Sequence, residues 1–203
     1  MNVFKNGLIT GLVLQLGIGP VFFFVANLAL QKTLLDGLAG VVAVTLGDYL
    51  YIALAILGIG ALIQKKKFKK MFGVASSIVL MLFGAFIIKN IMSVGMTTVV
   101  AIHSADIFSS FTSVFFLTIS NPMIIVWNTS LLSARAVEYN YTKRELAIFG
   151  FAVGLATLIF FGVSVMLLSL LKGTIPALLV QILNIIVGCL LIGYGAIRLG
   201  KVL

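Results

Sequence analysis

Six long apolar stretches in the sequence limit what this chain can fold into. Each is long enough to form a membrane-spanning helix, which needs about 20 predominantly apolar residues. The stretches cover residues 7–30, 38–63, 71–88, 107–134, 146–171 and 173–197. Five of them contain no Asp, Glu, Lys or Arg, and the second contains one such residue, Asp48. The pattern predicts an all-α, polytopic membrane protein with six transmembrane helices.

The composition excludes a water-soluble domain. Only 9% of the 203 residues are charged and 62% are hydrophobic, whereas about a quarter of the residues of a soluble domain are charged. The single cysteine, Cys189, cannot form a disulfide within the chain and supplies only one thiol to a metal site. We therefore expect no metal and no other cofactor.

The basic residues are distributed unequally between the two sides of the predicted membrane. If the N-terminus is cytoplasmic, eleven of the 14 Lys and Arg residues face the cytoplasm and three, Lys32, Lys89 and Lys172, face the other side. Cytoplasmic loops carry the Lys and Arg excess, so both termini are predicted to be cytoplasmic. The run KKKFKK at residues 65–70 then faces anionic lipid headgroups. Membrane lipids, and not nucleic acid, are the partners that the net charge of +9 indicates.

The chain divides into two halves with three apolar stretches each. A connecting loop at residues 93–106 separates residues 1–92 from residues 107–203, and together they are expected to form a single membrane domain. The halves are weakly similar, since GIGP at 17–20 aligns with ISNP at 119–122. An odd number of spans per half would place the second half upside down relative to the first, as in many secondary transporters.

Two prolines predict interruptions in the first and fourth helices. Proline removes a backbone N–H and frees the carbonyl four residues earlier, and paired interruptions of this kind indicate a binding site near the bilayer midplane. The ends of broken helices suit the carboxylate and the ammonium group of a small zwitterion such as an amino acid. Simple kinks are the alternative, because proline and glycine are common in membrane helices. The candidate substrate-binding residues are Gln15, Gly17, Gly19, Pro20, Asn121 and Pro122.

Asp48 is the candidate for coupling transport to protons. A charged side chain at the centre of a bilayer costs about 2.5–3.5 kcal/mol on insertion scales. We therefore expect Asp48 to face the interior of the bundle near Pro20 and Pro122, within reach of Gln15 or Asn121. The alternative interpretations of this carboxylate are a structural hydrogen bond and a hydrated position close to the membrane surface.

The other polar residues of the stretches are interpreted as interhelical hydrogen-bonding groups, which are common in membrane bundles. They are Asn27, Thr45, Thr118, Asn128, Gln181 and Asn184. The pairs Gly7/Gly11 and Gly150/Gly154 have the spacing that lets membrane helices approach closely. The stretches contain no paired carboxylates or Ser/His pair, and the sequence has no G-x-x-x-x-G-K-[ST] motif for ATP. The chain is therefore predicted not to be an enzyme.

Three motifs resemble the LysE/RhtB family of amino-acid exporters. They read Gly17-Ile18-Gly19-Pro20, Gly47-Asp48 and Asn121-Pro122-Met123 in the first, second and fourth stretches. The resemblance covers essentially the whole chain. It implies a six-span protein of the bacterial plasma membrane that exports amino acids or related small metabolites, driven by the proton gradient or the membrane potential. Pro20, Asp48, Asn121 and Pro122 would line its translocation path.

Two positions depart from the family pattern. Ile18 stands where the family usually has a proline, and Met123 stands where it usually has a lysine. The second change removes a cation from the fourth-span break and argues against a carry-over from exporters of basic amino acids. The alternatives are a cadmium-type cation effluxer and a non-transporting membrane scaffold. The first is disfavoured because the spans lack His, Glu and a second Cys for a soft cation. A homo-oligomer is left open.

Overall fold

The computed structural model describes residues 2–17, 19–58, 66–94, 106–172 and 177–202, and these residues form helices joined by short turns. Ile18, Lys65 and residues 95–105 of the connecting loop lie outside the described residues. The helices are α1 (Val3–Gln15), α2 (Pro20–Gln31), α3 (Leu34–Ile56), α5 (Lys66–Val94), α6 (Ile107–Ile119), α7 (Pro122–Glu138), α8 (Lys143–Leu171) and α9 (Ala177–Val202). The prediction of an all-α protein is confirmed for this part of the chain, which contains no strand.

Several of these helices are long and apolar enough to cross a membrane. By length and composition, α3, α8 and residues Asn184–Lys201 of α9 qualify on their own. Two bent pairs qualify together: α1 with α2 at 80°, and α6 with Ile124–Glu138 of α7 at 60°. The described residues thus offer up to five spans. The apolar part of α5, Gly73–Lys89, is shorter, so the sixth predicted span stays a prediction.

Local sequence signals explain where the helices begin. Pro20 occupies the first turn of α2, where its missing N–H costs nothing and its fixed φ suits a helix. The same capping box opens α3, with Thr33 and Asp36, and α8, with Thr142 and Glu145. In each, the threonine oxygen and the carboxylate accept hydrogen bonds from each other's backbone N–H groups, which stabilises the first turn.

The capping box corrects the predicted start of the second span. The apolar pattern placed its first residue at Leu38, but α3 begins at Leu34 and includes Asp36. Asp36 is 1% exposed. Helix α3 therefore contains a second carboxylate besides Asp48, and Asp36 is buried whereas Asp48 is half-buried.

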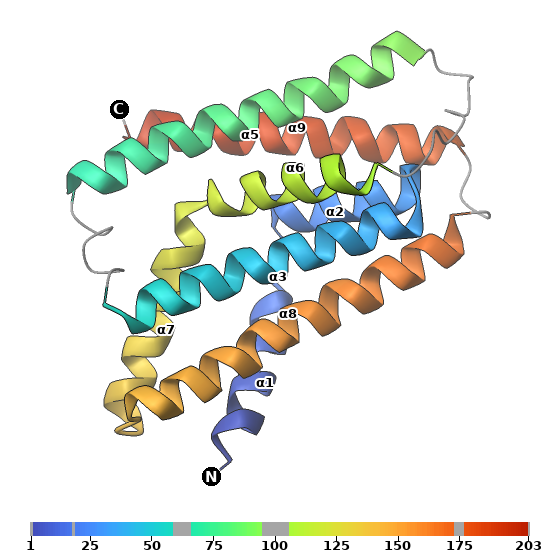
Figure 1. The fold of residues 1–203 in the computed structure, drawn as a ribbon. Coiled ribbons are helices and arrows are strands. Elements are labelled where there is room, and N and C mark those ends of the chain that lie inside the picture. Colours follow the sequence, from blue (N-terminus) through green and yellow to red (C-terminus); the bar gives the residue numbers. More distant parts are fainter. Residues whose placement is uncertain (1, 18, 59–65, 95–105, 173–176, 203) are drawn as a thin grey trace.

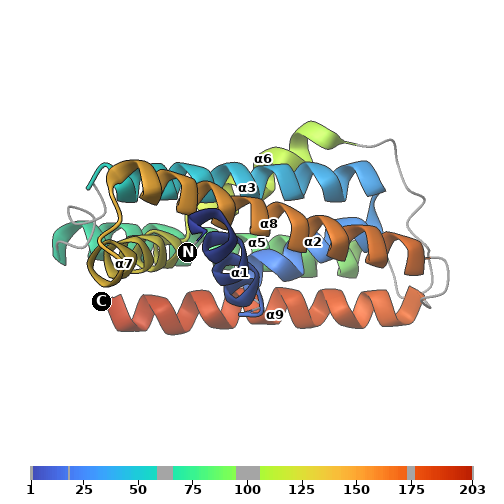
Figure 2. The ribbon, with the colours of Figure 1, turned by 90° about the horizontal axis from the view of Figure 1, so that it is seen from below.

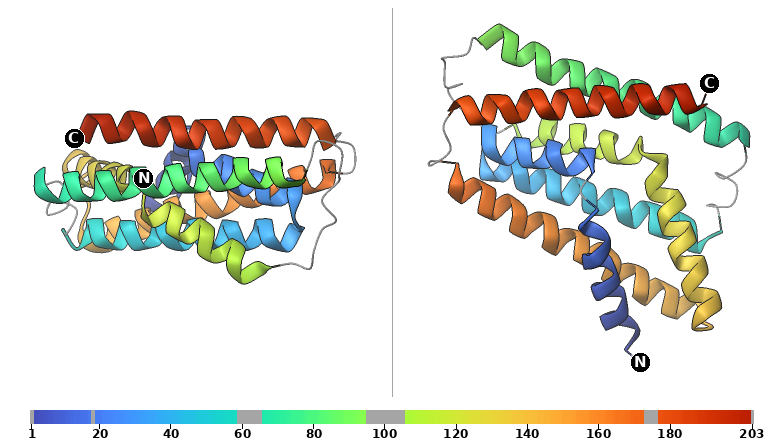
Figure 3. Two further views of the ribbon diagram at one scale, coloured as in Figure 1. Left: turned by 90° about the horizontal axis from the view of Figure 1, so that it is seen from above. Right: turned by 180° about the vertical axis from the view of Figure 1, so that it is seen from behind.

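The helices pack as an elongated bundle in which α5 and α9 lie side by side and run in opposite directions (Figures 1 and 3). Next to them, α3 contacts both α6 and α8, and α1 crosses α8 (Figure 2). The main contacts repeat when the halves are exchanged: α1 packs on α8 as α6 packs on α3, and α2 contacts α8 as α7 contacts α3. Each half therefore packs its broken helix on the middle helix of the other half.

Glycines let the helix backbones approach closely at two of these contacts. A Cβ atom on Gly11 of α1 would lie 2.6 Å from the Cβ of Ala156 on α8. A Cβ on Gly84 of α5 would lie 2.6 Å from the carbonyl oxygen of Gly188 on α9. Both distances are too short for real side chains, so these contacts require glycine.

Large apolar side chains cover much of the outer surface. Phe86 of α5, Val163 of α8 and Ile197 of α9 are 61%, 51% and 63% exposed. Exposed apolar surface of this extent marks contact with a membrane or a partner and is rare on soluble monomers. Together with the apolar helices, it supports a multi-pass membrane protein.

Candidate functional site

The first interruption lies between the end of α1 at Gln15 and the start of α2 at Pro20. The last turn of α1 tightens there, since the N–H groups of Leu16 and Gly17 donate to the carbonyls of Val13 and Leu14 at 3.2 and 3.1 Å. Gly19 caps the N-terminus of α2 in an extended conformation, with ψ of 179°. Gly17, Gly19 and Pro20 thus form the backbone of the break that the sequence predicted.

The second interruption lies between the end of α6 at Ile119 and the start of α7 at Pro122. Asn121 continues the turn, since its N–H donates to the carbonyl of Thr118 at 3.0 Å. The hydroxyl of Tyr51, on α3, donates to the carbonyl of Ile119. A side chain of α3 thus donates a hydrogen bond to one of the carbonyls that have no intrahelical partner at the end of α6.

Asp48 belongs to a hydrogen-bonded chain across three helices. The amide of Gln15, on α1, donates to the hydroxyl of Thr157 on α8 at 2.6 Å. The Thr157 hydroxyl in turn donates to Oδ2 of Asp48 on α3 at 2.7 Å. Gln15 is the last residue of α1, so this chain ties the first interruption to the carboxylate.

Thr157 is a site residue that the sequence analysis missed. It is fully buried, with 0% exposure, and it has both a donor and an acceptor role. Its hydroxyl is the one polar group in the segment GLATLIF at residues 154–160. The contact joins residues 109 positions apart for Asp48 and 142 apart for Gln15, so no local pattern could reveal it.

Arg198 is the second residue that sequence reasoning did not place at the site. Its Nη1 donates to Oδ1 of Asn121 at 3.3 Å, which brings a guanidinium from α9 to the second interruption. From the sequence alone, Arg198 is only one of the basic residues predicted on the cytoplasmic side. Its side chain is half-buried.

Helix α3 connects the two interruptions. Asp48 and Tyr51 lie three positions apart, which places them on neighbouring faces within one turn. Asp48 contacts Thr157 of α8, whereas Tyr51 reaches the end of α6. A Cβ on Gly47 would lie 2.6 Å from the Cγ2 of Thr118, so this glycine brings the backbone of α3 against α6.

The predicted site residues thus fall into two groups around α3. Gln15 and Asp48 are joined through Thr157, next to the first interruption. Asn121 lies at the second interruption with Arg198. Pro122 is the first residue of α7.

Two further polar clusters lie elsewhere. Oδ1 of Asp36 accepts from the hydroxyl of Ser110 at 2.7 Å, and Nζ of Lys32 donates to the same hydroxyl at 3.1 Å. Lys172 donates to the carbonyl of Lys32, so the start of α3, the start of α6 and the end of α8 meet here. In the other cluster, Asn184 of α9 accepts from Asn27 and Gln31 of α2.

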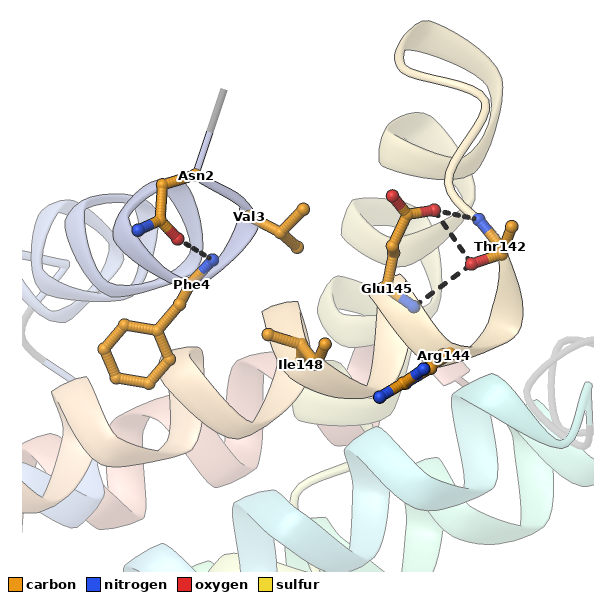
Figure 4. Close-up of a pocket in the computed structure, with 7 residues that line it drawn as sticks. All are labelled: Asn2, Val3, Phe4, Thr142, Arg144, Glu145 and Ile148. Atoms are coloured by element: carbon orange, nitrogen blue, oxygen red, sulfur yellow. Dashed lines mark hydrogen bonds between the residues drawn. The ribbon is translucent and has the colours of Figure 1, made fainter.

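A recess of about 540 Å³ lies between the starts of α1 and α8 (Figure 4). It is lined by Asn2, Val3, Phe4, Thr142, Arg144, Glu145 and Ile148. It is wide open, it contains the capping box of α8, and none of the predicted site residues lines it. We therefore place the candidate site at the interruptions.

Paired interruptions in an apolar helical bundle, with a carboxylate hydrogen-bonded through Thr157 to the first of them, are typical of a multi-pass membrane protein of the transporter class. The sequence model of the family described as LysE type translocator matches residues 12–199, which include both interruptions and Asp48. The chain belongs to this family, as its motifs had indicated. Searches of curated proteins and of solved structures gave no match.

Proposed function

We propose that this protein is a secondary active exporter of amino acids or related small metabolites across the plasma membrane. The observation that carries the proposal is the position of α3, whose Asp48 and Tyr51 contact the surroundings of both interruptions. Binding sites of secondary transporters form where discontinuous helices of two repeats meet. The family to which the chain belongs supports the same function.

Asp48 would bind the ammonium group of the substrate and the coupling proton in turn. Its carboxylate accepts one hydrogen bond from a neutral hydroxyl and, within the described residues, takes part in no ion pair. A carboxylate offers about four acceptor positions, so a cation can bind beside Thr157. An unpaired charge in the membrane interior is costly. Exchange of the ammonium for a proton keeps Asp48 neutralised, and this exchange would couple export to proton entry.

The hydrogen-bonded chain from Gln15 to Asp48 would link this exchange to the relative position of the two halves of the protein. Gln15 and Asp48 belong to the first half, and Thr157 belongs to the second. A cation that binds beside Thr157 shares the carboxylate with the Thr157 hydroxyl and weakens the hydrogen bond between them. Occupancy of Asp48 would therefore change the contact between the halves, whose relative movement alternates access in transporters of this construction.

An amino acid fits this site because it carries two opposite charges. Asp48 suits the ammonium group, and the N-terminal ends of α2 and α7, with their partial positive charge, lie at the two interruptions. A cadmium-type cation would find the oxygen atoms of Asp48 and Thr157 at this site, whereas soft cations prefer thiolates. Among the described residues, no three His, Cys, Asp or Glu side chains come together.

Counterflow in proteoliposomes tests this function. The full-length protein is reconstituted and assayed with a panel of amino acids and with cadmium, under imposed pH gradients. The proposal predicts counterflow of at least one amino acid and uphill efflux that follows the pH gradient. Transport of cadmium alone would identify a cation effluxer, and no transport of any compound would favour a scaffold.

We further propose that the protein lies in a bacterial plasma membrane with both termini in the cytoplasm. Arg135, Lys143 and Lys201 lie at the end of the bundle where α7 and α9 finish, and Lys32 and Lys172 lie at the opposite end (Figure 1). The first end would face the cytoplasm. A reporter that is active only outside the cytoplasm, fused after Leu203, should be silent, and an active fusion would require the inverse orientation.

A further inference from the structure

The geometry points to Arg198 as the residue that binds the carboxylate of the substrate, at the second interruption. This inference rests on the proposed function and extends it, because it assigns the anionic half of the substrate to a side chain of the last helix. It also predicts which compounds the site accepts: those with a free carboxylate.

Arg198 reaches the second interruption although it lies in the last helix of the chain. Its Nη1 donates to Oδ1 of Asn121 at 3.3 Å. Tyr51 of α3 donates to the carbonyl of Ile119, two residues before Asn121. Polar side chains from α3 and α9 therefore both contact residues at the break between α6 and α7.

The partner of Arg198 in the described residues is neutral. Among the described residues, the one ion pair joins Arg135 and Glu138. No carboxylate of these residues therefore lies within ion-pair distance of the Arg198 guanidinium. A guanidinium carries five N–H donors in a planar fork, and burying a charge without a counter-ion is costly. An anionic ligand with two parallel acceptors, such as a carboxylate, would satisfy this half-buried group in the bidentate geometry that arginine favours.

The position of Arg198 complements that of Asp48. Tyr51 lies one turn after Asp48 on α3, and its hydroxyl donates to the carbonyl of Ile119, two residues before the Asn121 side chain that Arg198 contacts. The segment that follows Asn121 is Pro122-Met123-Ile124 and contains no cation of its own. The site thus has an anionic group beside the first interruption and a cationic group beside the second, which matches the two charges of an amino acid.

The alternative is that Arg198 only anchors the end of α9 at the membrane surface. Long basic side chains near helix ends commonly extend to the headgroups. Lys201 provides the matched control, because it is an exposed basic residue on the same helix, three positions further on. Two residues with the same anchoring role should give the same result on neutralisation.

The experiment uses the full-length protein and its Arg198→Gln, Arg198→Lys and Lys201→Gln variants in proteoliposomes. The probes are L-amino acids, the matching α-amides, which lack the carboxylate, and the matching α-keto acids, which lack the ammonium group. Initial counterflow rates are measured over a range of concentrations. Size-exclusion profiles and thermal unfolding of the detergent-solubilised variants report on folding. If Arg198→Gln does not fold, Arg198→Lys, which keeps the positive charge, serves as the test.

The inference predicts that the unmodified protein transports amino acids and rejects the amides. Arg198→Gln should raise the half-saturating concentration about 10- to 100-fold, the range expected for a charged hydrogen bond. Arg198→Lys should show a smaller increase, and Lys201→Gln should match the unmodified protein. If only Arg198→Lys folds, a raised half-saturating concentration for amino acids in this variant supports the inference, and an unchanged one contradicts it.

The remaining outcomes separate the two proposals. Equal transport of amino acids and amides, or an unchanged Arg198→Gln variant, would overturn the role of Arg198 while the exporter function stands. Transport of keto acids without amino acids, lost in Arg198→Gln, would support Arg198 and overturn the amino-acid substrate. Transport of amides alone would overturn the role of Arg198 and the amino-acid substrate, while the exporter function stands.

Discussion

The buried hydroxyl of Thr157 donates a hydrogen bond to the carboxylate of Asp48, with 2.7 Å between the two oxygen atoms. The two residues lie on α8 and α3, the middle helices of the two halves. The same hydroxyl accepts from Gln15 at the end of α1. A single buried hydroxyl thus connects the proposed coupling carboxylate to the first interruption.

Thr157→Val should impair transport more than it impairs folding. Valine has nearly the same shape, but it leaves Asp48 and Gln15 without their shared partner, which costs about 1–3 kcal/mol for a buried polar group. We expect a loss of about tenfold or more in uphill efflux. Thr157→Ser, which keeps the hydroxyl, should retain most of the activity, and equal loss in both variants would show that the hydroxyl is not the deciding group.

Tyr51→Phe should slow transport by removing a hydrogen bond at the second interruption. It removes the hydroxyl that donates to the carbonyl of Ile119, a contribution of about 0.5–1.5 kcal/mol. Because the ring stays in place, we expect slower counterflow with a small change in the melting temperature. Tyr139→Phe is the control, since Tyr139 follows the last residue of α7 and is 36% exposed. The account predicts that this control transports at the normal rate, and a matching loss in both variants would contradict it.

Gly11→Ala should separate α1 from α8. The new methyl group would lie 2.6 Å from the Cβ of Ala156, and overpacking of this kind costs about 1–3 kcal/mol. A methyl group on Gly162, also on α8, would have no neighbouring atom within 4 Å beyond its own stretch of helix. Gly162→Ala should therefore be neutral or slightly stabilising. Thermal unfolding in detergent measures both, and equal stability of the two variants would show that the helices can adjust.

Asp36→Ala should destabilise the protein more than Glu145→Ala. Both residues complete a capping box with a threonine, but Asp36 is buried and also accepts from Ser110 of α6. Loss of the exposed Glu145 should have a small effect, and loss of the buried Asp36 should cost about 1–3 kcal/mol more because Ser110 loses its acceptor. The thermal unfolding of the two variants compares these costs, and a larger loss for Glu145→Ala would be unexpected.

The sequence predicted the features that depend on local chemistry. Uncharged apolar stretches predicted helices, and Pro20 and Pro122 predicted the two interruptions, because proline acts on its own helix turn. The start of α3 was placed at Leu38 because the apolar pattern begins there. The Thr33–Asp36 capping box, which is visible in the sequence, marks the earlier start.

The sequence could not predict which polar groups meet across the bundle. Thr157 resembles any hydroxyl in an apolar helix, and Arg198 resembles a basic residue at the cytoplasmic end of a span. Their roles follow from contacts with Asp48 and Asn121, which lie on other helices. Such contacts depend on helix rotation, which the apolar pattern of a helix exposed to lipid on one side defines only loosely.

The central claim is that Asp48 exchanges the substrate ammonium for a proton, and Asp48→Asn tests it most directly. Asparagine keeps the size of the side chain and can still accept from Thr157, but it cannot bind and release a proton. The measurement is uphill efflux under an imposed pH gradient and counterflow without one, in the same reconstituted variant. The account predicts that uphill efflux is abolished while the protein folds and inserts normally, with some counterflow retained. Normal uphill efflux by Asp48→Asn would show that the carboxylate is structural and would contradict the account.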